Sequence, residues 1–475
     1  MFILSIEKIS PAFIDFIPIL VSFFLILNSL TILIMGISRL FFIKAIDLKF
    51  PKIDCTNEPL ISIHLPTCNE PPELVIKTIK SILAGRYENF ELIVLSNNTT
   101  NKNVWKPLKD FCVSQGRHVK FYHYSKVYGY KAGALNIALQ LTSSKAEYIM
   151  VVDADYELIP DALNIAVKGI QSKKVDVLQF PQSYRNSGDK TRGLKTCYDH
   201  YFSYYLSSKK VDKMCLLTGT LSIMKASVFE VMGKWPTDTI TEDAHFGVNI
   251  LNEGMKISYS NVKIGNGLMP TTVDDYFKQY QRWVFGNFQT YILLFRKGKL
   301  PFKEKLKLGT LLTVWLNLLA YTFIVLLIVN PLLAILGVDI TLISTLAISN
   351  ILLHITIQLA ILLKSCKYNV WSCIKGFLIH LSSVDIGSFY WLSYVFNRQK
   401  PFKRTNKFLK RSTFDVTIYL LPTYMSLIAT ILYYYEYTGL ACMYIFFATL
   451  IMISKLTLIT ELKQSYNYIL KPQLL

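Results

Sequence analysis

The chain has 475 residues, of which 52% are hydrophobic and 17% are charged, and its mean hydropathy is +0.34. Soluble domains carry about 25% charged residues, so the composition excludes an ordinary soluble enzyme, and it is too apolar for a disordered chain. Eight cysteines without a Cys-x-x-Cys pair exclude a disulfide-rich scaffold. The net charge of +19 is typical of a membrane protein with basic cytoplasmic flanks or of a protein with a polyanionic ligand, and we expect no nucleic-acid partner.

Uncharged apolar residues are gathered in a few long stretches. The first, residues 16–38, has the length of one membrane crossing. No small-residue cleavage site follows it, so we expect an anchor rather than a signal peptide. Four later stretches are also long enough to span a bilayer: 308–338, 340–363, 416–435 and 437–454.

A further apolar stretch, residues 370–396, is divided by Lys375 and Asp385 into pieces too short to span a bilayer. The positive-inside rule places the basic flanks of the spans in the cytoplasm. Both ends of 370–396 then lie on the same side, so we expect an interfacial or re-entrant helix. The basic flanks lie within 39–49, 296–307, 364–367 and 400–411.

These segments predict a multi-pass protein of the cell (inner or plasma) membrane with a large cytoplasmic domain. The alternative is a channel or transporter with a large loop, but the spans lack the charged residues expected along an ion path. The expected organisation is an N-terminal anchor at 1–39, a cytoplasmic domain at 40–307, and a membrane region at 308–475 that contains the interfacial helix 370–396 and a cytoplasmic loop at 397–413.

The cytoplasmic domain alternates between strand-like and helix-like segments. Such alternation predicts a mostly parallel sheet covered by helices on both faces, and ligands of these sheets bind beyond the carboxyl ends of the strands. The predicted strands are 60–65, 90–95, 119–124 and 148–152, and the predicted helices are 73–83 and 131–141. Polar side chains at the strand ends are therefore candidate binding groups: Thr67, Asn69, Glu70, Asn97, Asp153 and Asp155.

The sequence Asp153-Ala154-Asp155 directly follows an apolar strand. Alternate residues of an extended chain face the same way, so the two carboxylates would share one face. This arrangement suits a hard divalent cation, Mg²⁺ or Mn²⁺, that bridges phosphates. The pattern alone also fits a solvated turn.

A second acidic motif, Thr241-Glu242-Asp243, precedes the apolar-periodic segment 246–251 and is therefore predicted at a helix N-terminus. One interpretation is a plain cap, with Thr241 as the capping residue and acidic side chains at the positive end of the helix dipole. The other is a pair of carboxylates that face a cleft. Both can hold for the same residues.

The third motif, Gln279-Tyr280-Gln281-Arg282-Trp283, lies shortly before the second apolar stretch. It fits an amphipathic interfacial helix that places Arg282 and Trp283 at the headgroup level. It also fits a binding site in which Arg282 meets a phosphate and Trp283 offers its ring face to a sugar.

The order of these three motifs, flanked by apolar stretches, resembles the processive glycosyltransferases of family 2, which include the cellulose, hyaluronan and chitin synthases and related β-glucan synthases. The resemblance covers residues 60–411. Residues 128–136 resemble the family's Lys-Ala-Gly-x-x-Asn segment beside the donor diphosphate. Residues 217–220 resemble its small-residue turn near the acceptor sugar, and an ordinary turn explains them equally well. Residues 401–407 resemble its gating loop, with Arg404 in place of valine, and also fit a basic flank.

One departure concerns the end of the second strand, where many members carry an aspartate that reads the uracil edge. This chain has Ser96-Asn97-Asn98-Thr99, which is similar to the Asp-Asn-Asn-Thr variant of some bacterial β-glucan synthases. An asparagine can donate to and accept from uracil, so UDP recognition is retained as an expectation. An altered donor specificity or an inactive donor-binding scaffold stays open.

The resemblance implies a GT-A-type, Rossmann-like α/β domain inserted between transmembrane helices. The implied activity is inverting transfer from a UDP-sugar, with UDP-glucose as the expected donor, to elongate a β-linked polysaccharide and pass it across the membrane. The implied partners are the UDP-sugar, the growing glycan, the lipid bilayer and an accessory export subunit. The alternative is a non-processive enzyme that adds one sugar to a lipid carrier. N-acetylglucosamine and mannose stay open as donor sugars.

Roles for individual residues follow from the same resemblance. Asp243 is the expected general base, supported by Glu242. Asp155 and Asp153 are expected to hold Mg²⁺ or Mn²⁺ against the UDP leaving group. Lys131 and Arg282 would add positive charge near the diphosphate, and Trp283 would seat the acceptor sugar. The remaining expected contacts are Thr67, Asn69, Glu70, Asn97 and Gln279 for the donor, and Gly219 and Thr220 for the acceptor.

Overall fold

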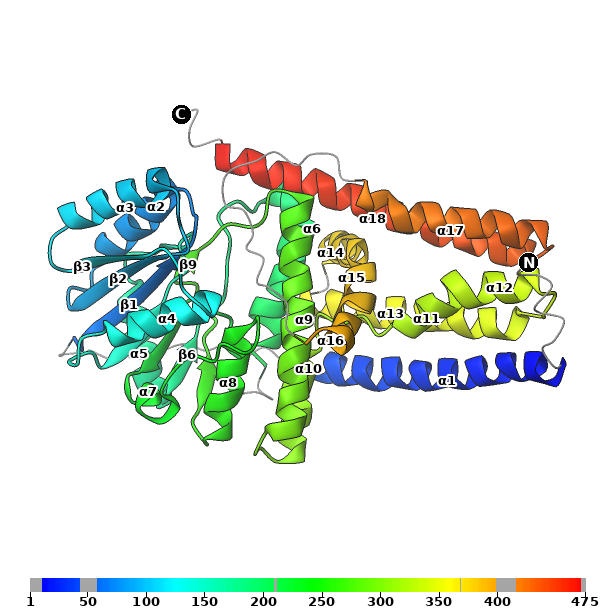
Figure 1. Ribbon diagram of the computed structural model, residues 1–475, viewed down its shortest axis with the longest axis horizontal. Helices are drawn as coiled ribbons and strands as arrows, with labels where there is room; N and C mark the ends of the chain where they lie inside the picture. The colour runs from blue at the N-terminus through cyan, green and yellow to red at the C-terminus, as the bar shows by residue number, and fades with distance from the viewer. Residues whose placement is uncertain (1–10, 43–57, 209–211, 368, 399–415, 471–475) are drawn as a thin grey trace.

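The computed structural model describes residues 11–42, 58–208, 212–367, 369–398 and 416–470. An α/β domain lies on one side of the molecule, and the long apolar helices lie on the other (Figure 1). The gating-loop resemblance at 401–407 and most of the expected loop 397–413 fall outside the described residues.

The α/β domain is built on a seven-stranded sheet in the order β3-β2-β1-β4-β7-β6-β8. Strands β1 to β4 are mutually parallel, and β7 runs antiparallel to β4 and to β6. The four predicted strands are confirmed. The strands are β1 (Ile61–Thr67), β2 (Phe90–Asn97), β3 (Val119–Tyr124), β4 (Tyr148–Val151), β6 (Val177–Gln179), β7 (Ser222–Lys225) and β8 (Ile257–Tyr259), and a separate small sheet pairs β5 (Glu157–Leu158) with β9 (Gly265–Asn266).

Helices cover both faces of this sheet, as the alternation of segments predicts. In β4, Ile149 and Val151 belong to one apolar core, whereas Tyr148 and Met150 belong to the other. The first core includes side chains of α4 (Tyr130–Gln140) and α8 (Glu242–Asn252). The second includes side chains of α2 (Pro72–Leu83), α3 (Lys102–Ser114) and α5 (Ala162–Lys173).

Among the described residues, four helices are long and apolar enough to cross a membrane: α1 (Pro11–Phe42), α13 (Thr341–Ser365), α17 (Thr417–Tyr434) and α18 (Thr438–Leu470). α1 packs against α13, and α17 packs against α18. Large apolar side chains on α1, such as Ile19 and Ile34, are about two-thirds exposed, at 66% and 65%. A surface of this kind is stable in contact with lipid.

The apolar stretch 308–338 does not form one continuous helix. Helix α10 (Phe302–Leu312) ends within this stretch, and after a non-helical segment an apolar helical run resumes over Ala320–Ile335. The main-chain carbonyls of Thr313 and Leu316 accept hydrogen bonds from the buried guanidinium of Arg39 on α1. Unpaired carbonyls are costly in an apolar environment, so this arginine makes the break possible. The later helices are α11 (Ala320–Ile324), η5 (Val325–Val329) and α12 (Asn330–Ile335).

The stretch 370–396 is divided into short helices. Asp385 pairs with Lys455 of α18 at 2.9 Å between Oδ2 and Nζ, and the Lys455 side chain is 1% exposed. This ion pair holds the short helices against the last long helix. They are α14 (Val370–Ser382), α15 (Val384–Phe389), η6 (Tyr390–Leu392) and α16 (Ser393–Phe396).

Several elements join the α/β domain to the apolar helices. Helix α9 (Val273–Lys297) stands between them (Figure 1). The C-terminal part of α18 reaches the α/β domain, where the Glu461 carboxylate accepts hydrogen bonds from the N–H groups of Gly193, at 3.1 Å, and Leu194, at 2.8 Å. These two residues lie in the first turn of α6 (Arg192–Asp199), so Glu461 supplies a negative charge at a helix N-terminus.

Candidate active site

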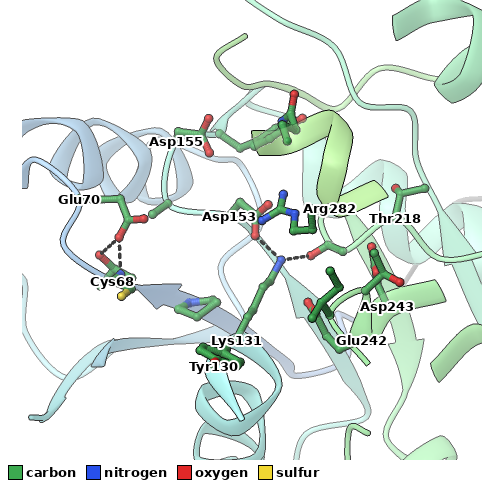
Figure 2. A pocket seen from close by; sticks show the side chains of 18 of the residues that line it. Cys68, Glu70, Tyr130, Lys131, Asp153, Asp155, Thr218, Glu242, Asp243 and Arg282 are labelled. Carbon is green, nitrogen blue, oxygen red and sulfur yellow. Dashed lines mark hydrogen bonds and ion pairs between the residues drawn. The ribbon is translucent and has the colours of Figure 1, made fainter. Parts of the chain in front are cut away.

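A cavity of about 390 Å³ lies beyond the carboxyl ends of β1, β2 and β4. This is the edge at which a parallel sheet is expected to bind its ligands. Of the site residues predicted from the sequence, only Thr220 is absent from the lining (Figure 2). The predicted residues that line the cavity are Thr67, Asn69, Glu70, Asn97, Lys131, Asp153, Asp155, Gly219, Glu242, Asp243, Gln279, Arg282 and Trp283.

The polar residues after β1 brace the loops at one end of the cavity. Glu70 accepts hydrogen bonds from the Thr67 hydroxyl, at 2.8 Å, and from the N–H of Cys68. Asn69 donates through its main-chain N–H to Thr99, at 2.8 Å, and through its side chain to the Asn98 carbonyl, at 3.0 Å. These bonds fix the loop after β1 against the loop after β2.

At the end of β2, Ser96 does not line the cavity. Its side chain is buried and within 3.2 Å of the Nδ1 atom of His123. The following residues, Asn97 and Asn98, do line the cavity. Two amide side chains, rather than the Ser96 hydroxyl, therefore face the cavity at the end of β2.

Asp153 and Asp155 both line the cavity. The sequence predicted that they share one face of an extended strand, and this prediction is wrong. Strand β4 ends at Val151 and a turn includes Asp155, so the two side chains do not share one face of an extended strand. Asp153 points toward Lys131, and Asp155 lies apart from it (Figure 2). Asp155 Oδ2 accepts a hydrogen bond from the N–H of Leu268 at 3.1 Å.

Lys131 links the aspartate motif to the opposite wall. Its Nζ lies 2.5 Å from Asp153 Oδ1 and 2.6 Å from the Gly219 carbonyl oxygen. Burial lowers the pKa of Lys131, but the negative charges of Asp153, Glu242 and Asp243 outweigh burial and raise it. Lys131 therefore keeps its positive charge between the two acidic motifs.

Glu242 and Asp243 begin α8, as the sequence predicts, and face the cavity. Thr241 occupies the N-cap position without a side-chain capping bond, so the plain-cap interpretation does not account for this residue. Burial raises the pKa of both carboxyl groups, and for Glu242 the charge of Asp243 raises it further. Lys131 and Arg282 oppose this shift. Carboxylates with raised pKa values in a cleft are suited to accept a proton.

Gly219 sits where Lys131 and Asp243 come together. Its φ is +79°, and a Cβ atom there would lie 2.9 Å from Asp243 Oδ2 and 3.3 Å from Lys131 Nζ. We expect Gly219→Ala to lower turnover by up to about 10²-fold, the effect of a displacement near 1 Å, because the added methyl group pushes the Asp243 carboxylate and the Lys131 ammonium from their places.

The matched control is Gly116→Ala, since Gly116 has a similar φ of +80° and open space around the added Cβ. Both variants introduce the same backbone strain. Assays of turnover and thermal unfolding on the two proteins separate strain from displacement. Equal activity in both variants would show that Gly219 has no special role in the site.

Helix α9 supplies the remaining wall. Gln279 Oε1 accepts a hydrogen bond from the Tyr198 hydroxyl at 2.7 Å. The Trp283 ring lies against Trp315, with centroids 4.5 Å apart. Gly286 lets α9 approach Thr241, because a Cβ at this glycine would lie 2.5 Å from the Thr241 side chain. The spacing of Gln279, Arg282 and Trp283 places all three on one helix face.

The cavity is also lined by residues that could not be selected from the sequence, among them Tyr156, Gln182, Tyr184 and Leu268. The Gln182 side chain donates to the Thr218 carbonyl at 2.6 Å. Its Oε1 accepts from the hydroxyls of Tyr184, at 3.1 Å, and Tyr156, at 3.3 Å. Gln182 thus ties the aspartate loop to the turn that contains Gly219.

The donor set of the cavity fits a divalent cation that substrate phosphates complete. Among the described residues, no group of three or more His, Cys, Asp and Glu side chains is placed to hold a metal ion by itself. Asp153 and Asp155 offer two carboxylates at the cavity wall. Mg²⁺ commonly binds through one or two carboxylates together with substrate phosphates.

The family follows from comparison with known sequences. The family model for glycosyl transferase family group 2 matches residues 148–458, and that for glycosyl transferase family 2 matches residues 62–233. The chain is a family 2 glycosyltransferase. Its three motifs therefore belong to an enzyme that transfers sugars.

Curated relatives of this glycosyltransferase include polysaccharide synthases. A probable glycosyltransferase of Sulfolobus acidocaldarius is 22% identical over 80% of this chain and 85% of its own length. A cellulose synthase catalytic subunit (UDP-forming) of Komagataeibacter sucrofermentans is 25% identical over 38% of this chain and 24% of its own length. A poly-β-1,6-N-acetyl-D-glucosamine synthase of Staphylococcus aureus is 24% identical over 47% of this chain and 53% of its own length.

Among solved structures, the glycosyltransferase is similar to the mannosyltransferase PcManGT from Pyrobaculum calidifontis, determined in complex with GDP-Man and Mn²⁺. The TM-score is 0.52 and the identity is 18%, and the match covers 82% of this chain and 100% of that one. This likeness confirms the expected GT-A-type α/β fold.

Proposed function

We propose that this glycosyltransferase transfers a sugar from a UDP-sugar, with UDP-glucose as the first donor to test, to a growing β-linked glycan. The names of the cellulose synthase and poly-N-acetylglucosamine synthase relatives support a polysaccharide product. The observation that carries the proposal is the meeting of Lys131 with Asp153 and Gly219, opposite the carboxylates of Glu242 and Asp243 on α8. This arrangement joins a phosphate-binding wall to a proton acceptor.

Asp243 is the proposed general base, which takes the proton of the acceptor hydroxyl as that oxygen attacks the anomeric carbon with inversion. Glu242 supports its charge and position. Asp153 and Asp155 would hold Mg²⁺ or Mn²⁺, which would stabilise the charge of the UDP leaving group when bound. Arg282 adds positive charge from the opposite wall, and Lys131 holds Asp153 and the Gly219 turn in place.

The donor nucleotide is proposed to lie between the loops after β1 and β2. Asn97 supplies the amide for the base, and Thr67, Asn69 and Glu70 shape the loop beside it. Trp283 of α9 faces the acceptor end, where it offers an apolar ring to a sugar, and Gln279 on the same helix face is proposed to contact the donor. Gly219 and Thr220 form the turn between the donor and acceptor ends.

A membrane location with the α/β domain in the cytoplasm is part of the same proposal. The four long apolar helices support a multi-pass protein. Basic residues at the domain side of these helices, such as Arg296 and Lys297 at the end of α9, support the cytoplasmic orientation. If the enzyme elongates its glycan processively, we also propose that the product is exported across the membrane, through this chain or with an accessory subunit.

A second candidate function is transfer of a single sugar to a lipid carrier. The observation that favours it is the closed space behind Trp283. Trp315, Tyr198 and Phe202 surround this indole, and the cavity beyond it measures only about 40 Å³. The cavity that holds the acidic motifs is about ten times larger, at about 390 Å³, so the wall behind Trp283 has to rearrange before a glycan passes.

The test is a panel of radiolabelled UDP-glucose, UDP-N-acetylglucosamine and GDP-mannose on the purified protein in membranes with Mg²⁺ or Mn²⁺. We expect a UDP-sugar to be incorporated into a high-molecular-weight product. Incorporation only into lipid-extractable material would support the second candidate. Incorporation from GDP-mannose alone, or from no donor, would contradict the proposal.

A further inference from the structure

The second aspartate of the Asp153-Ala154-Asp155 motif lies in a turn beyond the end of β4. The sheet ladder therefore does not fix its position, although its side chain is only 6% exposed. Hydrogen bonds to other segments hold Asp155 in place instead. The Asp155 carbonyl accepts a hydrogen bond from Arg185 Nη1 at 2.7 Å, and Asp155 Oδ2 accepts one from the Leu268 N–H at 3.1 Å.

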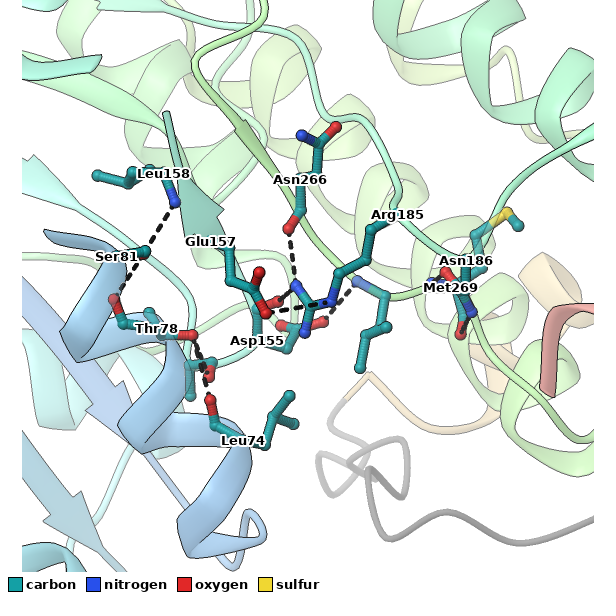
Figure 3. A network of polar contacts seen from close by, with 12 residues as sticks. Leu74, Thr78, Ser81, Asp155, Glu157, Leu158, Arg185, Asn186, Asn266 and Met269 are labelled. Atoms are coloured by element: carbon teal, nitrogen blue, oxygen red, sulfur yellow. Dashed lines mark hydrogen bonds and ion pairs between the residues drawn. The ribbon is translucent and has the colours of Figure 1, made fainter. Parts of the chain in front are cut away.

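Arg185 joins the two segments that provide these contacts. The same Nη1 atom donates to the Asn266 carbonyl at 2.9 Å, and the Nε atom lies 3.5 Å from Glu157 Oε1 (Figure 3). Asn266 ends β9, two residues before Leu268, and Glu157 begins β5. One guanidinium group thus fixes the Asp155 turn relative to the segment whose N–H binds the Asp155 carboxylate.

Arg185 is itself held by its neighbours. Its main-chain N–H donates to the Gly267 carbonyl at 3.0 Å. The next residue, Asn186, exchanges two hydrogen bonds with the main chain of Met269, at 3.0 and 2.8 Å. Its side chain also donates to Ser465 of α18 at 2.6 Å. The base of the Arg185 side chain is therefore pinned to both the α/β domain and the last long helix.

We propose that Arg185 is a positioning residue for Asp155, and that it thereby sets the affinity of the site for the divalent cation that would accompany a nucleotide diphosphate. The inference rests on the proposed function. Residues that orient metal ligands change metal affinity by about 10- to 100-fold when they are replaced. The rigid guanidinium fork serves two carbonyls and a carboxylate at once, which the single ammonium of a lysine does not reproduce.

The test is Mn²⁺ binding to the purified full chain in the presence of UDP, followed by electron paramagnetic resonance without any sugar transfer. We expect Arg185→Met to weaken Mn²⁺ binding by about tenfold or more, and Arg185→Lys to fall between this variant and the wild type. The matched control is Arg192→Met, which removes the arginine of an exposed pair with Asp189. This control should bind Mn²⁺ as the wild type does.

A double-mutant cycle with Asp155→Asn separates positioning from general structural damage. If Arg185 acts through Asp155, Arg185→Met adds little to the loss that Asp155→Asn causes alone. Unchanged Mn²⁺ affinity in Arg185→Met, or fully additive losses in the double variant, would overturn the inference. If Arg185→Met does not fold, Arg185→Lys decides, and wild-type affinity in that variant overturns it equally. A wild-type protein that binds UDP but no Mn²⁺ would refute the cation site and the inference with it.

Discussion

Asp243→Asn is expected to reduce sugar transfer by about 10³-fold, within the range that a positioned general base contributes, while UDP binding is retained. The asparagine keeps the shape of the side chain and its hydrogen bond to the Ala244 N–H, which Asp243 makes at 2.9 Å. It removes the only property that a base needs, the ability to take a proton. Turnover and UDP affinity should therefore separate in this variant.

Two comparisons sharpen this result. Glu242→Gln should have a smaller effect than Asp243→Asn, because Glu242 is proposed to support the base rather than to act as one. Asp238→Asn is the matched control, since it makes the same chemical change in the same segment on a side chain that is 64% exposed. Retained turnover in Asp243→Asn would refute the base assignment, and an inactive Asp238→Asn would point to a folding defect.

Lys131→Met is expected to lower transfer by about 10²-fold or more and to shift its pH dependence. The charge of Lys131 lowers the pKa of Asp243 and opposes the effect of burial. Its removal raises the Asp243 pKa, so the base stays protonated up to a higher pH. The acidic limb of the kcat profile should therefore move to higher pH.

The pH profile distinguishes an effect of Lys131 on the Asp243 pKa from an effect of its charge on the donor diphosphate alone. Lys299→Met is the control, because Lys299 is 69% exposed and pairs with Glu253 away from the cavity. A Lys131→Met enzyme with reduced kcat and an unshifted acidic limb would show that Lys131 does not act on the base. The diphosphate contact implied by the family resemblance would then account for its effect.

The sheet, and the polar residues that meet at the carboxyl ends of its strands, could be predicted from local sequence patterns. Strands β1, β2 and β4 are short and mostly apolar, and polar residues stand at or just beyond their ends: Thr67, Asn97 and Asp153. Parallel strands bring their carboxyl ends to one edge, so these side chains meet although they are distant in sequence. The acidic pair at the start of α8 is predicted for a similar reason, since its sequence position coincides with the beginning of an apolar-periodic segment.

Other features depend on partners that are far away in the sequence. The stretch 308–338 is uniformly apolar, and its break becomes possible only because Arg39 binds the exposed carbonyls. The role of Gln182 rests on contacts with Tyr156 and Thr218, which lie in two other segments of the chain. No local pattern marks this glutamine.

The direction of the Asp155 side chain also depends on residues that are distant in the sequence. A period-two argument assumes that the strand continues, but β4 ends at Val151. The chain turns, and Arg185 and Leu268 set the direction of the carboxylate. The sequence pattern identifies the two aspartates, whereas the contacts around them decide how they face the cavity.

The central claim, that Asp243 activates an acceptor hydroxyl for direct attack on the sugar, is tested most directly by the anomeric configuration of the new glycosidic bond. The measurement is proton NMR of the product formed from an α-linked UDP-glucose or UDP-N-acetylglucosamine donor. Direct attack inverts the anomeric carbon, so the account predicts a β-linked product. An α-linked product would contradict single displacement and the role proposed for Asp243.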